Sequence, residues 1–332
     1  MVIEMKSEII KKLRETDGYV SGQEICDSFG VSRTAVWKAI NSLKEEGFLI
    51  EAVPNKGYHL EETPDVLSKS EIESRLLTEW IGKKLYCYEK IDSTNTECKR
   101  LAEKVNESPD GTLVVTEKQV AGRGRRGRAW TAEAGTHLAM SLLLRPMFQP
   151  DRASMLTLVM ALSVAEGIDE ICKTDTQIKW PNDIVLNKKK ICGILTEMNT
   201  ELDFIHYVVI GIGINVNTRS FPEEISDTAT SIRKEMGREF SRASIIAAIM
   251  RAFEKNYALF VQTQDLSLLQ KNYEKKLANL NKEVRVLDPN GEYSGVAAGI
   301  NTSGELLVNR ENGEQSLVYA GEVSVRGIYG YI

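Results

Sequence analysis

The stretch AGRGRRGRAW (Ala121–Trp130) decides how the rest of this chain is interpreted. Its seven central residues, 122–128, contain four arginines and three glycines. A run of this composition has no period of core-facing residues, so it predicts a loop. The flanking segments TLVVTE (112–117) and HLAMSLLL (137–144) have the composition of strands. The sequence therefore predicts a cationic loop framed by strands on both sides.

Two kinds of ligand suit such a loop. Glycines allow backbone angles that bring N–H groups close to an anion, and the planar guanidinium of arginine matches phosphate oxygens two at a time. The alternative is an Arg–Gly arm that binds nucleic acid, or a loop that is merely solvated. Such arms tend to repeat and to lie at chain termini, whereas this loop is single and framed. The pattern favours a phosphate site for a small molecule.

The bulk composition excludes several classes of protein. The chain has 332 residues, enough for two or three domains, and a formal net charge of −5, so any basic site must be local. The five cysteines are scattered without a C-x-x-C pair, and the three histidines are not paired at ligand spacing. A disulfide framework, a zinc site and Ser-His-Asp catalysis are therefore not expected. We also expect a cytoplasmic protein without membrane contact, because no signal peptide or membrane-spanning run is apparent.

Residues 1–60 have the pattern of a winged helix-turn-helix. Ser21 and Ser32 stand where they can cap the second and third helices, and Gly30 and Gly47 stand where these helices would end. The segment 48–60 then predicts a two-stranded wing. A charged, proline-containing linker is expected over 61–71, so we place this first domain at residues 1–64.

The third helix of such a module is the one that enters the DNA major groove. The candidate DNA contacts on this helix and on the wing tip are Ser32, Arg33, Thr34, Trp37, Lys38, Asn55 and Lys56. A plain interaction module is the alternative. Residues 1–62 contain eight Lys and Arg against eleven Asp and Glu, so one copy should hold phosphates weakly. We therefore expect a dimer to be needed for tight binding.

The central region places more polar groups beside the cationic loop. In IDSTNTECKRLAEKV (91–105), Ser93 or Thr94 can cap a helix, which alone would explain a hydroxyl there. The strand GTLVVTEKQ (111–119) delivers Gln119 directly into the loop. These neighbours favour a site over a simple cap.

The segment IKWPNDIVLNKKKICGILTEM (178–198) reads as a strand, a bend and a hairpin. Lys179 lies between apolar residues and must face either water or an anion, whereas Lys188–Lys190 predict an exposed hairpin tip. The next strand, YVVIGIGINVN (207–217), contains glycines that permit close approach of a ligand.

Several of these segments, in this order, resemble the signature of biotin–protein ligases: IDSTN (91–95), GRGRRGR (122–128), KWPND (179–183), KKICGILTE (189–197) and GIGINVN (211–217). With the winged helix in front, the chain is similar to the bifunctional bacterial kind, a ligase that also represses the biotin operon. The resemblance extends from about residue 5 to the end.

The resemblance implies an α+β multidomain fold. Residues 1–64 would form the winged helix-turn-helix DNA-binding domain, and 65–281 the biotin- and ATP-binding catalytic domain of the class II aminoacyl-tRNA synthetase type, with a mixed sheet. Residues 282–332 would form an SH3-like β-barrel, which fits the short strand-like runs EVRVL (283–287), DPNGEYSGVAAGI (288–300), TSGELLVN (302–309) and GEVSV (321–325). Helices over about 241–261 and 265–280 would close the central domain.

The activity implied by the resemblance needs no nucleophile from the protein. The biotin carboxylate attacks the α-phosphate of ATP to give biotinyl-5′-AMP, and a specific lysine of the biotin carboxyl carrier protein then takes the biotinyl group. Positioning and charge neutralisation by the loop and Mg²⁺ would suffice, with no metal ligands assigned on the protein. The adenylate would also be the corepressor of a homodimer that binds operator DNA. A biotin-sensing repressor without activity, or a lipoate-type ligase, remain the alternatives.

The resemblance also implies roles for individual residues. The catalytic cations would be Lys179 and Arg125. The residues expected to bind biotin are Ser93, Thr94, Asn95, Gln119, Arg123, Gly124, Arg125, Lys179, Gly211 and Gly213. Those expected to bind ATP or the adenylate are Arg123, Arg125, Arg128, Trp130, Asn215 and Ser231, with 217–231 as a loop over adenine. No role is assigned to Arg126.

Overall fold

The computed structural model describes residues 2–61, 65–104, 108–288, 291–319, 324–327 and 331–332. It divides into two compact units, one formed by Met1–Leu77 with Ser241–Ala247 and the other by Thr78–Phe240 with Ala248–Ile332. The domain boundaries expected after residues 64 and 281 stay predictions, and residues 62–64 of the expected linker lie outside the described residues.

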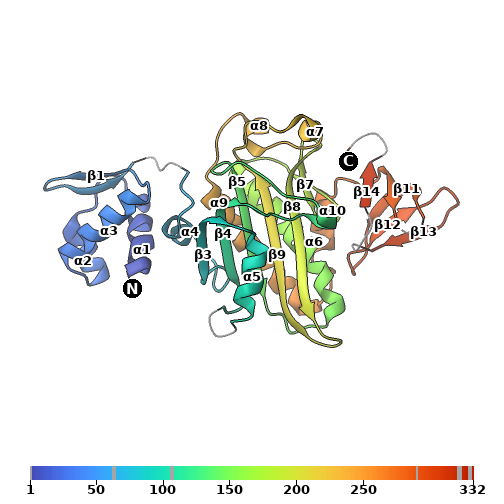
Figure 1. Cartoon of the computed structure of the whole chain (residues 1–332), viewed down its shortest axis with the longest axis horizontal. Helices are drawn as coiled ribbons and strands as arrows, with labels where there is room; N and C mark the ends of the chain where they lie inside the picture. The colour runs from blue at the N-terminus through green and yellow to red at the C-terminus, as the bar shows by residue number, and fades with distance from the viewer. Residues whose placement is uncertain (1, 62–64, 105–107, 289–290, 320–323, 328–330) are drawn as a thin grey trace. The chain divides into compact units, whose positions relative to one another are not determined.

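The N-terminal unit has the predicted winged helix-turn-helix (Figure 1). Its elements are α1 (Val2–Glu15), α2 (Gly22–Phe29), α3 (Arg33–Glu45), β1 (Ile50–Val53), β2 (Gly57–Leu60) and α4 (Lys69–Arg75). Ser21 and Ser32 cap α2 and α3, accepting hydrogen bonds from the backbone N–H three residues on at 3.0 and 3.2 Å. Helix α4 begins within the stretch expected to be a linker, because Arg14 of α1 binds Glu71 at 2.6 Å.

The second unit is built on a mixed sheet, whose described strands run in the order β3-β4-β5-β9-β8-β7-β6. These strands are β3 (Leu85–Ile91), β4 (Thr112–Gln119), β5 (His137–Leu144), β6 (Gln177–Lys179), β7 (Asp183–Leu186), β8 (Lys189–Thr200) and β9 (Ile205–Asn215). Strands β3 and β4 are parallel and the other neighbours are antiparallel. The predicted mixed sheet is confirmed.

Helices cover this sheet and close its ends. They are α5 (Thr94–Ala102), η1 (Arg125–Gly127), η2 (Pro150–Met155), α6 (Leu156–Cys172), α7 (Glu223–Ser226), α8 (Ile232–Met236), α9 (Arg242–Thr263) and α10 (Gln270–Lys276). Helix α5 lies against the sheet (Figure 1), and its Cys98 and Leu101 are buried in one cluster with Val114, Leu143 and Val209. Residue 105, the expected end of this helix, lies outside the described residues.

The helix expected over about 265–280 is shorter than predicted. It ends at Lys276 because the following residues join the sheet: Leu277 bridges Ile178 in parallel, and the Ala278 N–H donates to the Ile178 carbonyl oxygen at 2.8 Å.

The C-terminal strands form a separate antiparallel sheet in the order β13-β12-β11-β10-β14, as far as the described residues extend. They are β10 (Glu283–Leu287), β11 (Tyr293–Ile300), β12 (Leu306–Asn309), β13 (Gln315–Val318) and β14 (Ser324–Gly327). Strand β13 was not predicted, and part of GEVSV (321–325) lies outside the described residues. Alternate residues such as Val284, Val286, Leu306 and Val308 are buried, as a small β domain requires.

Candidate active site

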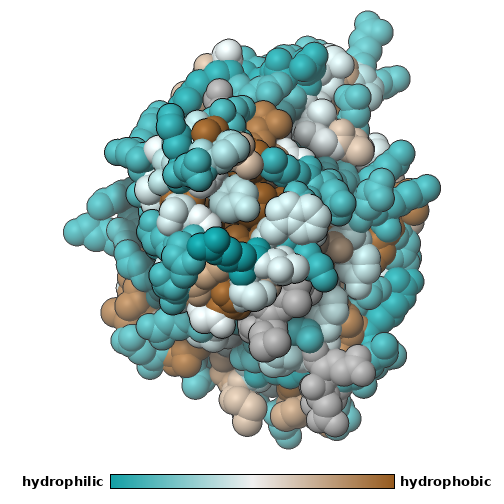
Figure 2. Space-filling model, turned by 90° about the vertical axis from the view of Figure 1, so that its left-hand side faces the viewer, coloured by the Kyte–Doolittle hydropathy of each residue, from teal (hydrophilic) through white to brown (hydrophobic). Residues whose placement is uncertain are grey.

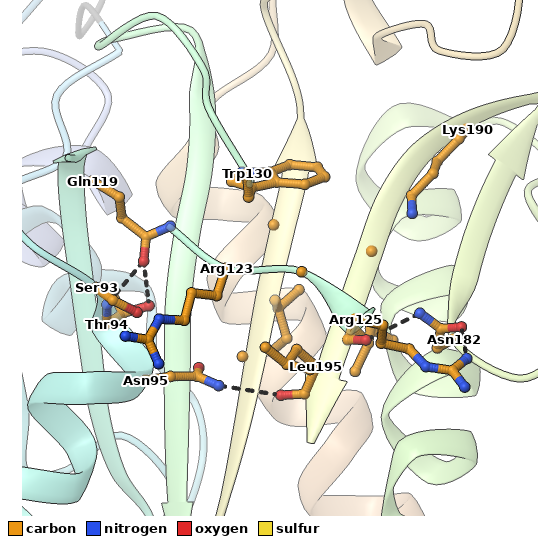
Figure 3. A pocket seen from close by; sticks show the side chains of 16 residues that line it. Ser93, Thr94, Asn95, Gln119, Arg123, Arg125, Trp130, Asn182, Lys190 and Leu195 are labelled. Carbon is orange, nitrogen blue, oxygen red and sulfur yellow. Dashed lines mark hydrogen bonds between the residues drawn. The ribbon is translucent and has the colours of Figure 1, made fainter. Parts of the chain in front are cut away.

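A pocket lies beside the cationic loop on the face of the sheet where α5 begins (Figure 3). Its lining residues are Ser93, Thr94, Asn95, Gln119, Arg123, Gly124, Arg125, Trp130, Asn182, Lys190, Gly193, Ile194, Leu195, Gly211, Ile212 and Gly213. They come from five segments far apart in the sequence. The predicted biotin residues therefore lie together, with the exception of Lys179.

The register of the strands explains why the floor of the pocket has room. Ser141 of β5 pairs with Gly211 of β9, which pairs with Leu195 of β8, so these residues form one row across the sheet. The next row toward the loop contains Gly213 and Gly193. Side chains of a row project to one face, and the glycines leave a trough in that face.

Side chains from outside the sheet enter this trough. A Cβ added at Gly211 would stand 2.1 Å from Oδ1 of Asn95, and one added at Gly213 would stand 2.6 Å from the Trp130 indole. We expected both glycines to let biotin approach the backbone. In this structure the room that they leave is taken by Asn95 and Trp130.

The end of the pocket nearest α5 is lined by hydroxyl and amide groups. Ser93 precedes α5 but its side chain makes no capping bond within the described chain, so the hydroxyl is not used as the expected cap. Gln119 accepts hydrogen bonds from the backbone N–H and the hydroxyl of Thr94 at 2.8 and 3.1 Å (Figure 3). This end can therefore both donate to and accept from a polar ring.

The cationic loop closes on itself at the opposite end. The Gly124 N–H donates to the Arg128 carbonyl oxygen at 2.7 Å and the Trp130 N–H to that of Gly122 at 2.9 Å. Arg126, to which no role was assigned, adopts a left-handed φ of 58° and is exposed. The loop thus holds a fixed turn that separates inward-facing from exposed arginines.

Arg125 points into the pocket and is held there by KWPND. Its Nη1 donates to Oδ1 of Asn182 at 2.6 Å (Figure 3). Burial lowers the pKa of Arg125, while the charge of Asp183 opposes this effect. A guanidinium that has lost part of its hydration gains more from a bound anion than an exposed one does.

Lys190 is the principal correction to the sequence analysis. The exposed hairpin tip is Asn187–Lys188, whereas Lys190 already belongs to β8. Its ammonium lines the pocket and lies 2.6 Å from Oδ1 of Asp183. Counting charges in the stretch 188–190 could not reveal this, because the start of the strand decides which lysine turns inward.

Lys179 is the one predicted biotin residue outside the pocket lining of the described chain. Its side chain is 7% exposed, and its ammonium lies 3.4 Å from the centroid of the Tyr331 ring. Lys179 pairs in register with Asp183, whose Oδ2 accepts from the Tyr331 hydroxyl at 2.5 Å. Asp183 thus lies between Lys179, its partner in the strand register, and Lys190, which lines the pocket.

The remaining predicted nucleotide residues are not among those that line the pocket. Arg128 is exposed. The Asn215 amide donates to the Thr230 carbonyl oxygen at 3.1 Å. Ser231 is fully buried and caps α8, accepting from the Lys234 N–H at 3.1 Å and donating to the Thr218 carbonyl oxygen at 2.6 Å. Contacts of these residues with a nucleotide stay predictions.

The N-terminal unit carries a groove between α3 and the wing. It is lined by Ser21, Gly22, Gln23, Arg33, Val36, Ala52, Val53, Pro54, Asn55, Lys56, Gly57 and Tyr58. Helix α3 buries Val36 and Ile40 and exposes the predicted DNA contacts, with Trp37 57% exposed. The Ser32 hydroxyl is used in the cap. Figure 2 shows a mostly hydrophilic face in which hydrophobic residues form small separate groups.

No group of three or more His, Cys, Asp or Glu that could hold a metal ion occurs among the described residues. Nor does any described helix combine the length and apolarity needed to cross a bilayer.

Comparison with known proteins agrees with this geometry. Residues 87–215 match the family described as Biotin/lipoate A/B protein ligase, 6–59 an HTH domain, and 280–326 the Biotin protein ligase C terminal domain. The chain is 40% identical to a bifunctional ligase/repressor of Bacillus subtilis over 328 residues, 97% of this chain and all of the relative. The chain belongs to the bifunctional ligase/repressor family. The HTH match lies in its N-terminal unit, and the match to the ligase family lies in its second unit.

Other relatives of this ligase/repressor extend the comparison. The bifunctional ligase/repressor of Escherichia coli is 31% identical over 306 residues, covering 92% of both chains. The solved biotin protein ligase of Aquifex aeolicus, in complex with biotin and ATP, is 33% identical with a TM-score of 0.66 and covers 74% of this chain and 99% of that one. The predicted fold class is confirmed.

Sequence reasoning missed several residues of the ligase pocket. They are Asn182, Lys190, Gly193, Ile194, Leu195 and Ile212 in the lining, with Ser141 and Glu197 directly behind it. Pairing the runs KKICGILTE and GIGINVN as neighbouring strands would have placed the glycines together. The sequence offers no signal for Ser141, which lies between Met140 and Leu142 in a mostly apolar strand.

Proposed function

We propose that this chain is an ATP-dependent ligase that forms biotinyl-5′-AMP and transfers biotin to one lysine of the biotin carboxyl carrier protein of acetyl-CoA carboxylase. We also propose that it represses the genes of biotin synthesis with the same adenylate as corepressor. The observation that carries the proposal is a single pocket with a neutral polar end and a cationic end, in a chain of this family.

The neutral end suits the ureido ring of biotin. That ring carries two N–H donors and a carbonyl acceptor, and it needs a site with groups of both kinds. The Ser93 hydroxyl, which is not used as a helix cap, can donate, and the Asn95 side chain offers an acceptor. The runner-up substrate, lipoate, has a ring of carbon and sulfur that cannot form these bonds.

The cationic end suits the reacting groups. The biotin carboxylate and the α-phosphate of ATP are both negative, so their approach is opposed until cations neutralise them. Arg123, Arg125 and Lys190 line the pocket, and Lys179 lies beside Asp183. We infer that Lys179 exchanges the ring of Tyr331 for the carboxylate and phosphate when the substrates bind.

The second step needs only a path for the acceptor lysine. Its neutral amine attacks the acyl carbon of the adenylate and AMP leaves, with the negative charge on its phosphate. Arg125 and Lys179 would stabilise that leaving group, so the same cations serve both steps. The protein therefore supplies position and charge, not a nucleophile.

Mg²⁺ is proposed as a companion of ATP. Magnesium in nucleotide sites keeps several waters and uses one or two carboxylates together with the phosphates, and here it would neutralise phosphate charge. The Asp183 carboxylate and the Asn182 amide oxygen fit this need, since both lie at the cationic end. If Asp183 bound the metal, its ion pair with Lys190 would be released, and Lys190 could then bind the nucleotide.

The repressor function rests on coupling between the units. Adenylate in the pocket would order the loops at 121–130 and 217–231, reduce the entropy lost on assembly, and so favour a homodimer. Two helix-turn-helix modules on one dimer would then bind a two-fold operator. Consumption of the adenylate by unmodified carrier protein would reverse this, and we place the whole cycle in the cytoplasm.

A labelling experiment tests the proposal. Purified protein is incubated with Mg²⁺, ATP, biotin and the carrier domain, and pyrophosphate and the mass of the carrier are measured. We expect stoichiometric pyrophosphate and one biotin on one lysine. If the protein binds biotin but does not label the carrier, the remaining interpretation is a biotin-sensing repressor without ligase activity. Labelling with lipoate in place of biotin would overturn the choice of substrate.

A further inference from the structure

The Asn95 side chain donates hydrogen bonds to two acceptor atoms of strand β8. Its amide nitrogen donates to a carboxylate oxygen of Glu197 at 2.7 Å and to the Leu195 carbonyl oxygen at 3.3 Å (Figure 3 draws the second bond). An ionised carboxylate and a backbone carbonyl can only accept. These two bonds therefore require that the amide nitrogen, and not the oxygen, faces Glu197.

The Asn95 oxygen must then lie on the other side of the amide, where Ser141 and the pocket are. The Ser141 hydroxyl oxygen lies 2.6 Å from this oxygen and 2.7 Å from the Thr94 hydroxyl oxygen. Asn95 Oδ1 has no proton to supply, so Ser141 donates the hydrogen bond between Ser141 and Asn95. A carbonyl oxygen accepts two bonds, and Ser141 uses one of them. The other acceptor position is left for the pocket.

The charge of Glu197 is maintained by its surroundings. Lys99 lies 2.5 Å from the carboxylate oxygen that Asn95 does not use. Burial by itself raises the pKa of Glu197, but the hydrogen bonds from Lys99 and Asn95 and the charges of Lys99 and Arg123 outweigh it, so the pKa lies below its ordinary value. Glu197 therefore stays an acceptor at neutral pH.

We propose that Glu197 and Ser141 are positioning residues that hold Asn95 with its oxygen toward the ligand, and thereby select a ring that presents an N–H donor there. This inference rests on the proposed function and specifies the substrate: a cyclic urea fits, whereas a dithiolane leaves the oxygen without a partner. Sites built to bond a polar hydrogen strongly reject analogues that lack it.

Substitution of Glu197 by Gln tests the inference. The glutamine amide can donate as well as accept, so Asn95 loses the constraint on its orientation. Affinity for biotin and for desthiobiotin, which keeps the urea, is measured by calorimetry, and KM and kcat by pyrophosphate exchange. We expect about a tenfold or larger loss of affinity for both ligands. The KM for ATP and kcat at saturating biotin should change little.

Three further variants make the result specific. Glu201→Gln removes the same charge at an exposed position of the β8–β9 hairpin and should leave all values unchanged. Ser141→Ala should weaken biotin in the same way through the other side of Asn95. Adding Asn95→Asp to Glu197→Gln exchanges donor and acceptor between the two residues, and it should restore part of the affinity for biotin. A merely structural role predicts no such rescue.

The outcomes separate this inference from the proposed function. If the wild type neither binds nor activates biotin, the proposed function fails. If the wild type is active but Glu197→Gln and Ser141→Ala keep wild-type affinity for biotin, the inference alone is overturned. If Glu197→Gln does not fold, Ser141→Ala decides the question on its own.

Discussion

At the scale of single residues, we propose that the pocket separates recognition of the ring from the reaction. Asn95 and Gln119 belong to the neutral end, where hydrogen bonds fix their side chains. Arg125 belongs to the reacting end, where Asn182 holds its guanidinium. Side chains that are already held by hydrogen bonds lose less entropy when a ligand binds, which favours the reactive geometry.

Arg125→Ala is predicted to weaken retention of the adenylate. A hydrogen bond to a charged group contributes about 1.5–3 kcal/mol, so the dissociation rate of biotinyl-5′-AMP should rise by about tenfold to a hundredfold. Stopped-flow fluorescence would measure the rate, and Arg126→Ala, an exposed arginine of the same loop, should dissociate as the wild type does. Equal rates for all three proteins would contradict the role given to Arg125.

Gly211→Ala is predicted to disturb Asn95. The new methyl group would stand 2.1 Å from Asn95 Oδ1, so the amide must move. The affinity for biotin should then fall by about tenfold or more, because one hydrogen bond to the ligand is lost. Gly193→Ala should have a smaller effect, because its nearest neighbour, at 3.1 Å, is the flexible end of Lys190. Calorimetry with biotin alone checks the order of the two effects.

At the scale of elements, local pattern and strand register explain what the sequence could predict. The caps at Ser21 and Ser32 depend on residues nearby in the chain, and the structure has both. Gln119 could be placed beside the loop because it directly precedes it. Ser141 and Glu197 could not be predicted, because only the pairing of β5 with β9 and of β9 with β8 brings them under Asn95.

The same limit applies to lysines and helix ends. Whether Lys189 or Lys190 faces the pocket depends on the register of β8, because a shift of one residue reverses the face. The end of α10 depends on the bridge from Leu277 to Ile178, which lies 99 residues away in sequence (277 minus 178). Family resemblance supplied the site residues that pattern alone could not.

Helix α3 is predicted to bind DNA through its exposed face. The double variant Arg33→Ala, Lys38→Ala should weaken binding to any duplex and reduce the slope of log K against log salt by about 2, since each phosphate contact contributes about 0.9. The matched double variant Lys271→Ala, Lys275→Ala removes two exposed charges from α10 and should keep the wild-type slope. Fluorescence anisotropy at several salt concentrations decides; an unchanged slope in the first variant would exclude α3 as the DNA contact.

At the scale of the whole molecule, one ligand is proposed to control two functions. The net charge of −5 gives the chain no general affinity for DNA, so repression must come from local cations and from assembly. Because the helix-turn-helix lies in one compact unit and the ligase pocket in the other, dimerisation is the step that would link them.

Biotin and ATP together are predicted to shift the protein from monomer to dimer. Each one alone should leave the sedimentation coefficient unchanged, because only the adenylate reaches both ends of the pocket. EDTA should abolish the shift by removing Mg²⁺ from the reaction, while preformed biotinyl-5′-AMP should produce it even with EDTA present. A dimer in the absence of any ligand would refute this form of control.

A crystal structure with biotinyl-5′-AMP would test these roles most directly. We expect the ureido ring against Ser93, Asn95 and Gln119, and the acyl-phosphate between Arg125 and Lys179, with Lys179 turned away from Tyr331. An adenylate bound with its ring at the cationic loop, or with its phosphate away from both cations, would contradict these roles.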